Sequence, residues 1–195
     1  MNNFFEILRP GINSTFQDSG RNNLSHIGIP SSGAMDKRNY LLANSLVGNK
    51  LDFPVIEFAM QGPLIKYNGN DIFIAITGDV IFKIKKKEKE IIGNCFENYL
   101  IEDGDTIDVI STNKSVYGYL AISGKLNIKP QWESFSVNTK ANIGANNGEK
   151  IITNCGFGCN ISNKAELLSR LTSAQSTLCL NDTSVTKFER SRRGS

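Results

Sequence analysis

Residues 11–49 read GINSTFQDSGRNNLSHIGIPSSGAMDKRNYLLANSLVGN and contain the only histidine of the chain. Glycines at positions 11, 20, 28 and 33 divide the first part of this stretch, and polar side chains stand between them. Glycine is used where the backbone needs a positive φ or a close approach to another group. Polar groups held by a rigid scaffold are typical of binding loops. The pattern therefore predicts a shaped loop that carries the functional groups.

The second part of the stretch has helical spacing. Asp36 is a candidate N-cap, because its carboxylate can accept the free amides of the first helical turn. Gly48-Asn49 is a matching stop signal. Between these signals the apolar residues recur at intervals of three and four, as in an amphipathic helix. We expect one main helix over about residues 36–47, with an apolar face made of Tyr40, Ala43 and Val47.

The rest of the first 125 residues consists of short segments of strand length separated by turns. Asn68-Gly69 and Asp103-Gly104 are dipeptides that favour tight reversals. Many short strands with regular turns and a single good helix predict a mostly β fold, either an antiparallel barrel or a sandwich. The predicted strands are 4–8, 55–60, 64–67, 72–77, 80–85, 90–92, 106–110 and 117–122.

Composition limits the class of protein. The 195 residues suffice for one domain, or for one lobe and an appendage. The net charge of +3 is too small for nucleic-acid binding that depends on electrostatic attraction, so no nucleic-acid partner is expected. We find no signal peptide and no apolar run of membrane-spanning length, so we expect a cytoplasmic protein without a membrane partner.

The four cysteines give a weak signal for metal binding. Cys155 and Cys159 form one CxxxC pair, but zinc needs four ligands, and no second pair or histidine stands nearby. We therefore assign no metal ligands. The chain also lacks the GxxxxGK[ST] motif, so any use of ATP would not depend on a P-loop.

Three ordered blocks of the opening stretch resemble one known family. They are Gln17-Asp18-Ser19-Gly20-Arg21, the run from His26 to Asp36, and the run from Ala43 to Asn49. The resemblance is to the family of the biotin-dependent carboxyltransferases, which includes allophanate hydrolase subunit 2 and the C subunit of 5-oxoprolinase. It continues weakly through residues 57–63, 75–78 and 119–124, and it fades beyond about Lys150.

The resemblance implies a cyclophilin-like β-barrel, with two such lobes in a full-length member. We accordingly divide the chain into a carboxyltransferase-type lobe, residues 1–150, and a shortened or diverged segment, residues 151–195, with a short helix at 165–174 and a disordered tail. The implied activity is hydrolysis of amide or lactam C–N bonds, driven by ATP in the oxoprolinase case, or carboxyl transfer from carboxybiotin to urea. The implied partner is a related second subunit, similar to the B subunit of 5-oxoprolinase or to allophanate hydrolase subunit 1.

The resemblance also assigns roles to polar residues of the loop and its surroundings. Arg21 would hold an anionic group of the substrate, and His26 or Asp36 would transfer protons. Glu57 is a further acid or base, because apolar neighbours can raise the pKa of a carboxyl group. The predicted catalytic residues are His26, Asp36 and Glu57, and the predicted substrate-binding residues are Gln17, Asp18, Arg21, Ser31, Ser32 and Asn44.

Each of these assignments has a structural alternative. Ser31 or Ser32 could join His26 and an aspartate in a catalytic triad, but turn residues that bind their own backbone are the more usual use of serine and aspartate. His26 could be a half-buried histidine satisfied by carbonyl groups. Arg21 could pair with Asp18 or Asp36 to fasten the loop. Glu57 could simply face water or a partner.

Three positions depart from the family pattern. An arginine that precedes the Tyr-Leu-Ala block of the family is replaced by Tyr117. The Gly-Ser-Arg-Ser-Thr block corresponds to residues 133–137, which read ESFSV, and a paired glycine becomes Gly124-Lys125. If those arginines bind an anionic substrate in the family, this chain lacks two guanidinium groups that could each bind it through two hydrogen bonds. An alternative function is therefore a non-catalytic module that binds a partner subunit or a regulatory protein.

Overall fold

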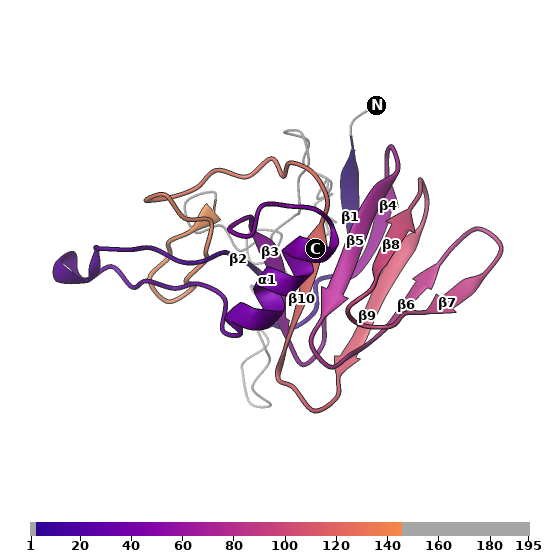
Figure 1. Cartoon of the computed structure of the whole chain (residues 1–195), viewed down its shortest axis with the longest axis horizontal. Coiled ribbons are helices and arrows are strands. Elements are labelled where there is room, and N and C mark those ends of the chain that lie inside the picture. Colours follow the sequence, from indigo (N-terminus) through magenta and orange to yellow (C-terminus); the bar gives the residue numbers. More distant parts are fainter. Residues whose placement is uncertain (1–2, 146–195) are drawn as a thin grey trace, which may run out of the picture.

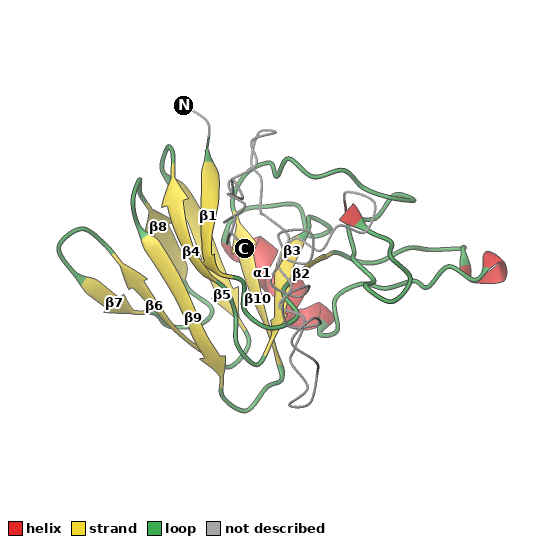
Figure 2. Ribbon diagram, turned by 180° about the vertical axis from the view of Figure 1, so that it is seen from behind, coloured by secondary structure: helices red, strands yellow, loops and turns green. Residues whose placement is uncertain are grey.

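The computed structural model describes residues 3–145 of the chain as two antiparallel sheets with one α-helix. The strands of the first sheet lie in the order β1 (Phe4–Arg9), β4 (Leu64–Asn68), β9 (Thr106–Thr112), β6 (Val80–Lys85) and β7 (Glu90–Ile92). The second sheet has the order β2 (Thr15–Gln17), β3 (Val55–Ala59), β10 (Tyr117–Ile122), β5 (Ile72–Thr77) and β8 (Asn98–Ile101). The two sheets and the helix are seen from opposite sides in Figures 1 and 2.

The main hydrophobic core lies between the sheets. Alternate residues of each strand point into it, as the period of two along a strand requires. Phe5, Ile65, Tyr67, Phe82 and Val109 enter the core from the first sheet and are buried. The second sheet contributes Phe16, Ile56, Phe58, Ile74, Ile76 and Leu120.

Helix α1 (Lys37–Leu46) covers the other face of the second sheet. It contacts β3, β5 and β10, and its Tyr40 and Ala43 pack with Val55, Tyr119 and Ala121 in a smaller core. The second sheet therefore lies between two apolar layers, so side chains on both of its faces are buried.

The predicted elements agree closely with the structure. The mostly β fold with one main helix is confirmed, and Asp36 caps α1 by accepting a hydrogen bond from the Asn39 amide at 3.1 Å. Strands β5, β6, β7 and β10 have the predicted bounds, and β1, β3, β4 and β9 differ only at their ends. The predicted helix at 165–174 and the proposed boundary at residue 150 lie outside the described residues.

Strands β2 and β8 and the short 3-10 helix η1 (Ser25–Ile27) were not predicted. β2 has three residues in a loop rich in polar side chains, and all three are buried, so the alternation that marks a half-buried strand is absent. Between residues 3 and 145, no helix is long and apolar enough to cross a bilayer.

Candidate functional site

The predicted binding loop consists of two arms that run side by side. One arm follows β2 and the other leads into α1. The Arg21 amide donates to the Ser31 carbonyl at 2.7 Å, and the Ala34 amide donates to the Asp18 carbonyl at 2.9 Å. The residues between the arms, 22–30, project from the body of the protein with η1 at their tip (Figures 1 and 2).

Close contact between the arms explains one of the glycines. A Cβ atom at Gly20 would lie 2.7 Å from the Ser31 carbonyl oxygen and 2.8 Å from that of Ser32, and Gly20 has a φ of +87°. A side chain at this position would push the arms apart. At Gly28, in contrast, a Cβ atom would meet nothing within 4 Å.

The Asp18 carboxylate ties the loop to residues 134–136, which come from the far end of the described chain. It accepts hydrogen bonds from the Ser134 hydroxyl at 2.7 Å, the Phe135 amide at 2.6 Å and the Ser136 hydroxyl. It also accepts the Gly20 amide at 2.8 Å, and Asp18 itself is only 5% exposed. This carboxylate is therefore occupied by protein donors.

Arg21 lies beside Asp18 and is 3% exposed. Its Nη2 donates to the Ser136 carbonyl at 2.6 Å and its Nε donates to the Gln131 carbonyl at 3.2 Å. Within residues 3–145 its Nη1 has no hydrogen-bond partner, and the guanidinium forms no ion pair. Burial lowers the pKa of Arg21, and the Asp18 charge opposes this shift. The alternative of an ion pair with Asp18 or Asp36 is thus wrong, because backbone carbonyls hold the side chain.

Gln17 and Ser32 also leave buried polar atoms free. Gln17 Nε2 donates to the Thr15 hydroxyl and the Val137 carbonyl, both at 2.9 Å. Its Oε1 and the Ser32 hydroxyl oxygen are buried without a partner among the described residues, whereas Ser31 is exposed. Unsatisfied buried polar atoms are rare in folded proteins, so each of these atoms is a place where ordered water or a ligand belongs.

Asn44 lies near the opposite end of α1 from Asp36. Its Nδ2 donates to the Phe53 carbonyl at 2.7 Å and its Oδ1 accepts from Asn49 at 3.1 Å. Eight residues separate it from Asp36, which places it about 12 Å farther along the helix axis. Through these two hydrogen bonds Asn44 fixes the C-terminal end of α1.

His26 is also separate from the other predicted residues. It is exposed in η1 at the tip of the projecting segment, and it makes no hydrogen bond or ion pair within the described chain. Asp18 is bonded to Ser134 and Ser136, and Asp36 caps α1. The triad considered from the sequence is therefore not assembled in this structure.

Glu57 and Tyr119 form a second polar group, beneath the start of α1. Glu57 is 4% exposed and its Oε2 accepts the Met35 amide at 2.8 Å. Tyr119 lies directly opposite Glu57 on the neighbouring strand, interacts with its carboxylate, and accepts the Asp36 amide on its hydroxyl at 2.7 Å. The alternative that Glu57 faces water is wrong, because α1 and the preceding loop cover this face of the sheet.

Burial raises the pKa of Glu57, and the Asp36 charge adds to this effect, while hydrogen bonds from Met35 and Tyr119 oppose it. Burial and the Glu57 charge also raise the pKa of Tyr119. A buried carboxyl group with a raised pKa is a candidate general acid or base, and the raised pKa of Tyr119 keeps its phenol protonated beside it. Tyr119 was missed as a functional residue because its pairing with Glu57 is a contact between distant strands.

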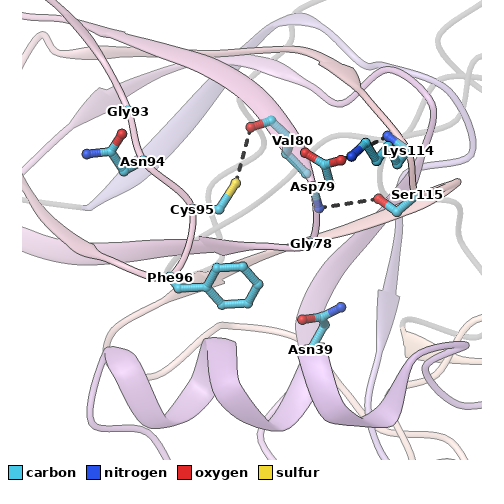
Figure 3. A pocket seen from close by; sticks show the side chains of 10 residues that line it. All are labelled: Asn39, Gly78, Asp79, Val80, Gly93, Asn94, Cys95, Phe96, Lys114 and Ser115. Atoms are coloured by element: carbon cyan, nitrogen blue, oxygen red, sulfur yellow. Dashed lines mark hydrogen bonds between the residues drawn. The ribbon is translucent and has the colours of Figure 1, made fainter.

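Two cavities lie near these groups. One, of about 410 Å³, lies where the arm carrying Arg21 meets the segment that carries Trp132, and it is lined by Gly20, Arg21, Asn22, Asn23, Leu24, Trp132 and Glu133. The other, of about 710 Å³, is an open groove between the N-terminal half of α1 and the turns around Asp79, Cys95 and Lys114 (Figure 3). No predicted site residue lines the groove. In the described chain no cluster of His, Cys, Asp and Glu is arranged to hold a metal ion.

Comparison with known proteins relates this architecture to one family. The model of the carboxyltransferase domain, subdomain A and B, matches residues 27–185. Urea amidolyase of Lachancea kluyveri is 34% identical over 145 residues, which is 74% of this chain and 8% of that protein. The C subunit of 5-oxoprolinase from Haemophilus influenzae is 28% identical over 143 residues, which is 73% of this chain and 45% of that protein.

A solved structure agrees with these matches. The urea carboxylase of Kluyveromyces lactis superimposes with a TM-score of 0.70 and 30% identity, over 77% of this chain and 13% of that chain. The chain thus spans less than half the length of each of these relatives. Its mostly β architecture agrees with the cyclophilin-like barrel that the sequence resemblance implies. The match over most of its length shows that the chain belongs to the carboxyltransferase domain, subdomain A and B, family.

Proposed function

We propose that the chain serves in a system that acts on amide or lactam C–N bonds, of the ATP-dependent 5-oxoprolinase or the allophanate hydrolase and urea carboxylase type. The observation that carries this proposal is the similarity of one lobe to both a urea amidolyase and a 5-oxoprolinase C subunit. Both kinds of system handle a small molecule in which a carbonyl carbon is bonded to nitrogen. The chemistry they share is proton transfer at that bond.

The Glu57–Tyr119 pair is the best candidate for this proton transfer. Its raised pKa allows Glu57 to hold a proton at a higher pH than an exposed carboxyl group, and Tyr119, whose raised pKa keeps it neutral, can hold the carboxyl group in place through its hydroxyl. The arm that leads into α1 covers Glu57, so a substrate would reach it only after the Met35 amide moves away from the carboxylate. Asp36, one residue farther on, would then line the opening.

The proposal includes two cofactors, ATP and carboxybiotin. The 410 Å³ cavity has Arg21 as its one cationic lining residue, which does not fit a triphosphate, because phosphates need several cations or a cradle of backbone amides. ATP would then be bound by another subunit. The guanidinium and the two asparagine amides of the cavity do fit the carboxylate of carboxybiotin, which would supply the carboxyl group for transfer when bound.

A related second subunit, similar to the B subunit of 5-oxoprolinase or to allophanate hydrolase subunit 1, is the proposed partner. Support comes from the 5-oxoprolinase relatives, whose designation as a C subunit implies other subunits.

The second candidate is a non-catalytic module that binds a partner or regulatory protein. The observation in its favour is that the Asp18 carboxylate is bonded to protein donors, and that two of the three guanidinium nitrogens of Arg21 are bonded to protein carbonyls. Residues used in this way fasten a loop, which a binding module needs as much as an enzyme does.

The test is to reconstitute the chain with a related second subunit and to assay 5-oxoproline, allophanate and urea with ATP present. We expect ATP-dependent turnover of one substrate, which falls at least tenfold in Glu57→Gln while the complex still forms. A stable complex without turnover of any of the three would favour the module over the enzyme. Asp36→Asn, which keeps the helix cap but removes the carboxylate, tests in the same assay whether Asp36 transfers protons.

A further inference from the structure

The projecting segment, residues 22–30, carries no aspartate, glutamate, lysine or arginine. It reads NNLSHIGIP, and His26 is its one titratable residue. Charged residues make up 21% of the whole chain, and 21% of nine residues is about two. Charged side chains are mostly found on surfaces in contact with water, whereas the centre of a protein interface is depleted of them. The segment thus has the composition of an interface, although it projects from the body of the protein.

The tip of the segment has a defined shape without support from the described body. The Ile27 and Ile29 amides donate to the Leu24 carbonyl at 3.1 and 3.3 Å. The Gly28 amide donates to the Ser25 carbonyl at 3.1 Å, so the tip closes on itself. None of the residues of η1 is buried, and Ile27 is 59% exposed. An apolar side chain is therefore presented at the end of a hydrogen-bonded turn.

The root of the segment is held by a buried network. The Asp18 carboxylate accepts four hydrogen bonds from described residues, and the Arg21 amide is bonded to the Ser31 carbonyl on the other arm. The Arg21 side chain is fixed by the carbonyls of Gln131 and Ser136. Ordering a segment before it binds lowers the entropy cost of association. The network therefore prepares the segment for binding in the way that a preorganised docking element requires.

We propose that the projecting segment is the element through which the chain docks on its second subunit, with Ile27 inserted into an apolar, uncharged cleft of that subunit. A single exposed isoleucine is ordinary in a folded protein. Here it stands at the end of an uncharged projection with a fixed root, and a cleft is the surface that such a projection fits. The identity of the partner rests on the proposed function, whereas the docking surface rests on the segment itself.

The side chains of the segment are arranged like a small interface, with an apolar centre and a polar rim. Ile27 is the centre, and neutral polar side chains that are exposed lie around it: Asn22, Asn23 and Ser25. These amides and the hydroxyl can pair with backbone groups at the mouth of a cleft. A membrane fits the segment poorly, because the segment has no lysine or arginine to bind lipid head groups. The 5-oxoprolinase relatives, which are named as C subunits, favour a different subunit over a second copy of the chain.

Ile27→Asp in the full chain is the variant that tests the inference. Because Ile27 is exposed, we expect the melting temperature to stay within about 3 °C of the wild type. An unpaired carboxylate in an apolar cleft is costly, so the affinity for the second subunit should fall at least tenfold. Isothermal titration calorimetry measures this affinity, with the B-subunit or allophanate hydrolase subunit 1 homologue that is used for reconstitution. Ile27→Leu keeps the apolar surface and should bind within about threefold of the wild type.

Ile92→Asp is the matched control. Ile92 is 72% exposed in β7, and β7 lies at the opposite end of the molecule from the projecting segment (Figure 1). The same chemical change at this isoleucine should leave the affinity unchanged. Equal affinities of the wild type and Ile27→Asp, or equal losses in Ile27→Asp and Ile92→Asp, would overturn the inference. It would also be overturned if the wild type bound neither kind of second subunit.

Analytical ultracentrifugation of the chain by itself tests the other occupant of the docking surface. We expect the wild type to sediment as a monomer. A dimer that Ile27→Asp dissociates would assign the segment to a second copy of the chain and overturn the assigned partner.

The outcome is distinguishable from that of the proposed function. Turnover in the reconstituted complex, with the same affinity between the subunits in the wild type and in Ile27→Asp, would overturn the inference alone. A complex that depends on Ile27 but turns over no substrate would overturn the proposed reaction and leave the docking surface.

Discussion

Glu57 and Tyr119 lie directly opposite each other on β3 and β10, and each accepts a backbone amide from the two residues before α1. Glu57 Oε2 receives the Met35 amide at 2.8 Å, and the Tyr119 hydroxyl receives the Asp36 amide at 2.7 Å. One cross-strand pair therefore fixes the end of the binding loop to the sheet. A change in the charge of Glu57 should therefore alter the stability of the protein and the hydrogen bonds that hold the start of α1.

The first prediction concerns the pH dependence of stability through Glu57. Burial raises its pKa in the folded state above 4.5, so between that value and the raised pKa the folded protein binds more protons than the unfolded chain. The stabilising contribution is present at low pH and is lost as pH rises through the raised pKa. We expect Glu57→Gln, whose charge is fixed at zero, to gain stability relative to the wild type between pH 4 and pH 8.

Urea denaturation of both proteins at pH 4, 6 and 8 measures this difference. Because the other titrating groups are common to both proteins, their contributions cancel. A difference in unfolding free energy that stays constant from pH 4 to pH 8 would contradict the assigned environment of Glu57.

The second prediction concerns the Asp18 carboxylate. Asp18→Asn removes the charge that accepts the Ser134 and Ser136 hydroxyls and the Phe135 amide, and its NH₂ group faces donors. We expect a loss of about 3 kcal/mol in unfolding free energy, because hydrogen bonds to a buried charge are worth more than neutral ones. Asp36→Asn is the control, since asparagine caps a helix as well as aspartate does, and it should change stability by under about 0.5 kcal/mol. Equal effects of the two substitutions would disprove the anchoring role of Asp18.

The third prediction compares two glycines of the loop. Gly28→Ala introduces only the strain of a positive φ and should cost about 1 kcal/mol. Gly20→Ala adds a clash with the carbonyls of Ser31 and Ser32 and should cost about 3 kcal/mol in total. Thermal and urea denaturation measure both. Similar costs at the two positions would show that the arms are not held in close contact.

The fourth prediction concerns His26. Because it is exposed and makes no hydrogen bond or ion pair in the described chain, His26→Ala should change stability by under about 0.5 kcal/mol. Turnover in the reconstituted complex decides its role. Unchanged activity would remove His26 from the predicted catalytic residues, whereas a loss of at least tenfold would require the projecting tip to meet the substrate in the assembly.

Most of the fold was predictable from local signals. Strand-length segments between turn residues predicted strands at 72–77 and 80–85 with the observed bounds, and Asp36 with the apolar spacing after it predicted α1. β2 was missed because it is only three residues long and buried on every residue. β8 was missed although it has ordinary strand length, and its place is fixed by pairing with β5.

The candidate site was predictable in part. The loop and its glycines were identified, and the structure brings Gln17, Asp18 and Arg21 together there. Their partners at 131–137 lie more than a hundred residues away, so no local pattern could have paired them. No local signal separated His26 and Asn44 from the group either.

The order of turns, helix and strands and the membership of the family follow from the sequence by itself, because glycine placement, capping residues and apolar spacing act over a few residues. Tertiary structure alone decided which polar groups are buried, which donors each carboxylate receives and which donor of Arg21 is left over. These properties depend on which distant strands become neighbours, and burial changes the pKa of Glu57 only after that assembly has excluded water.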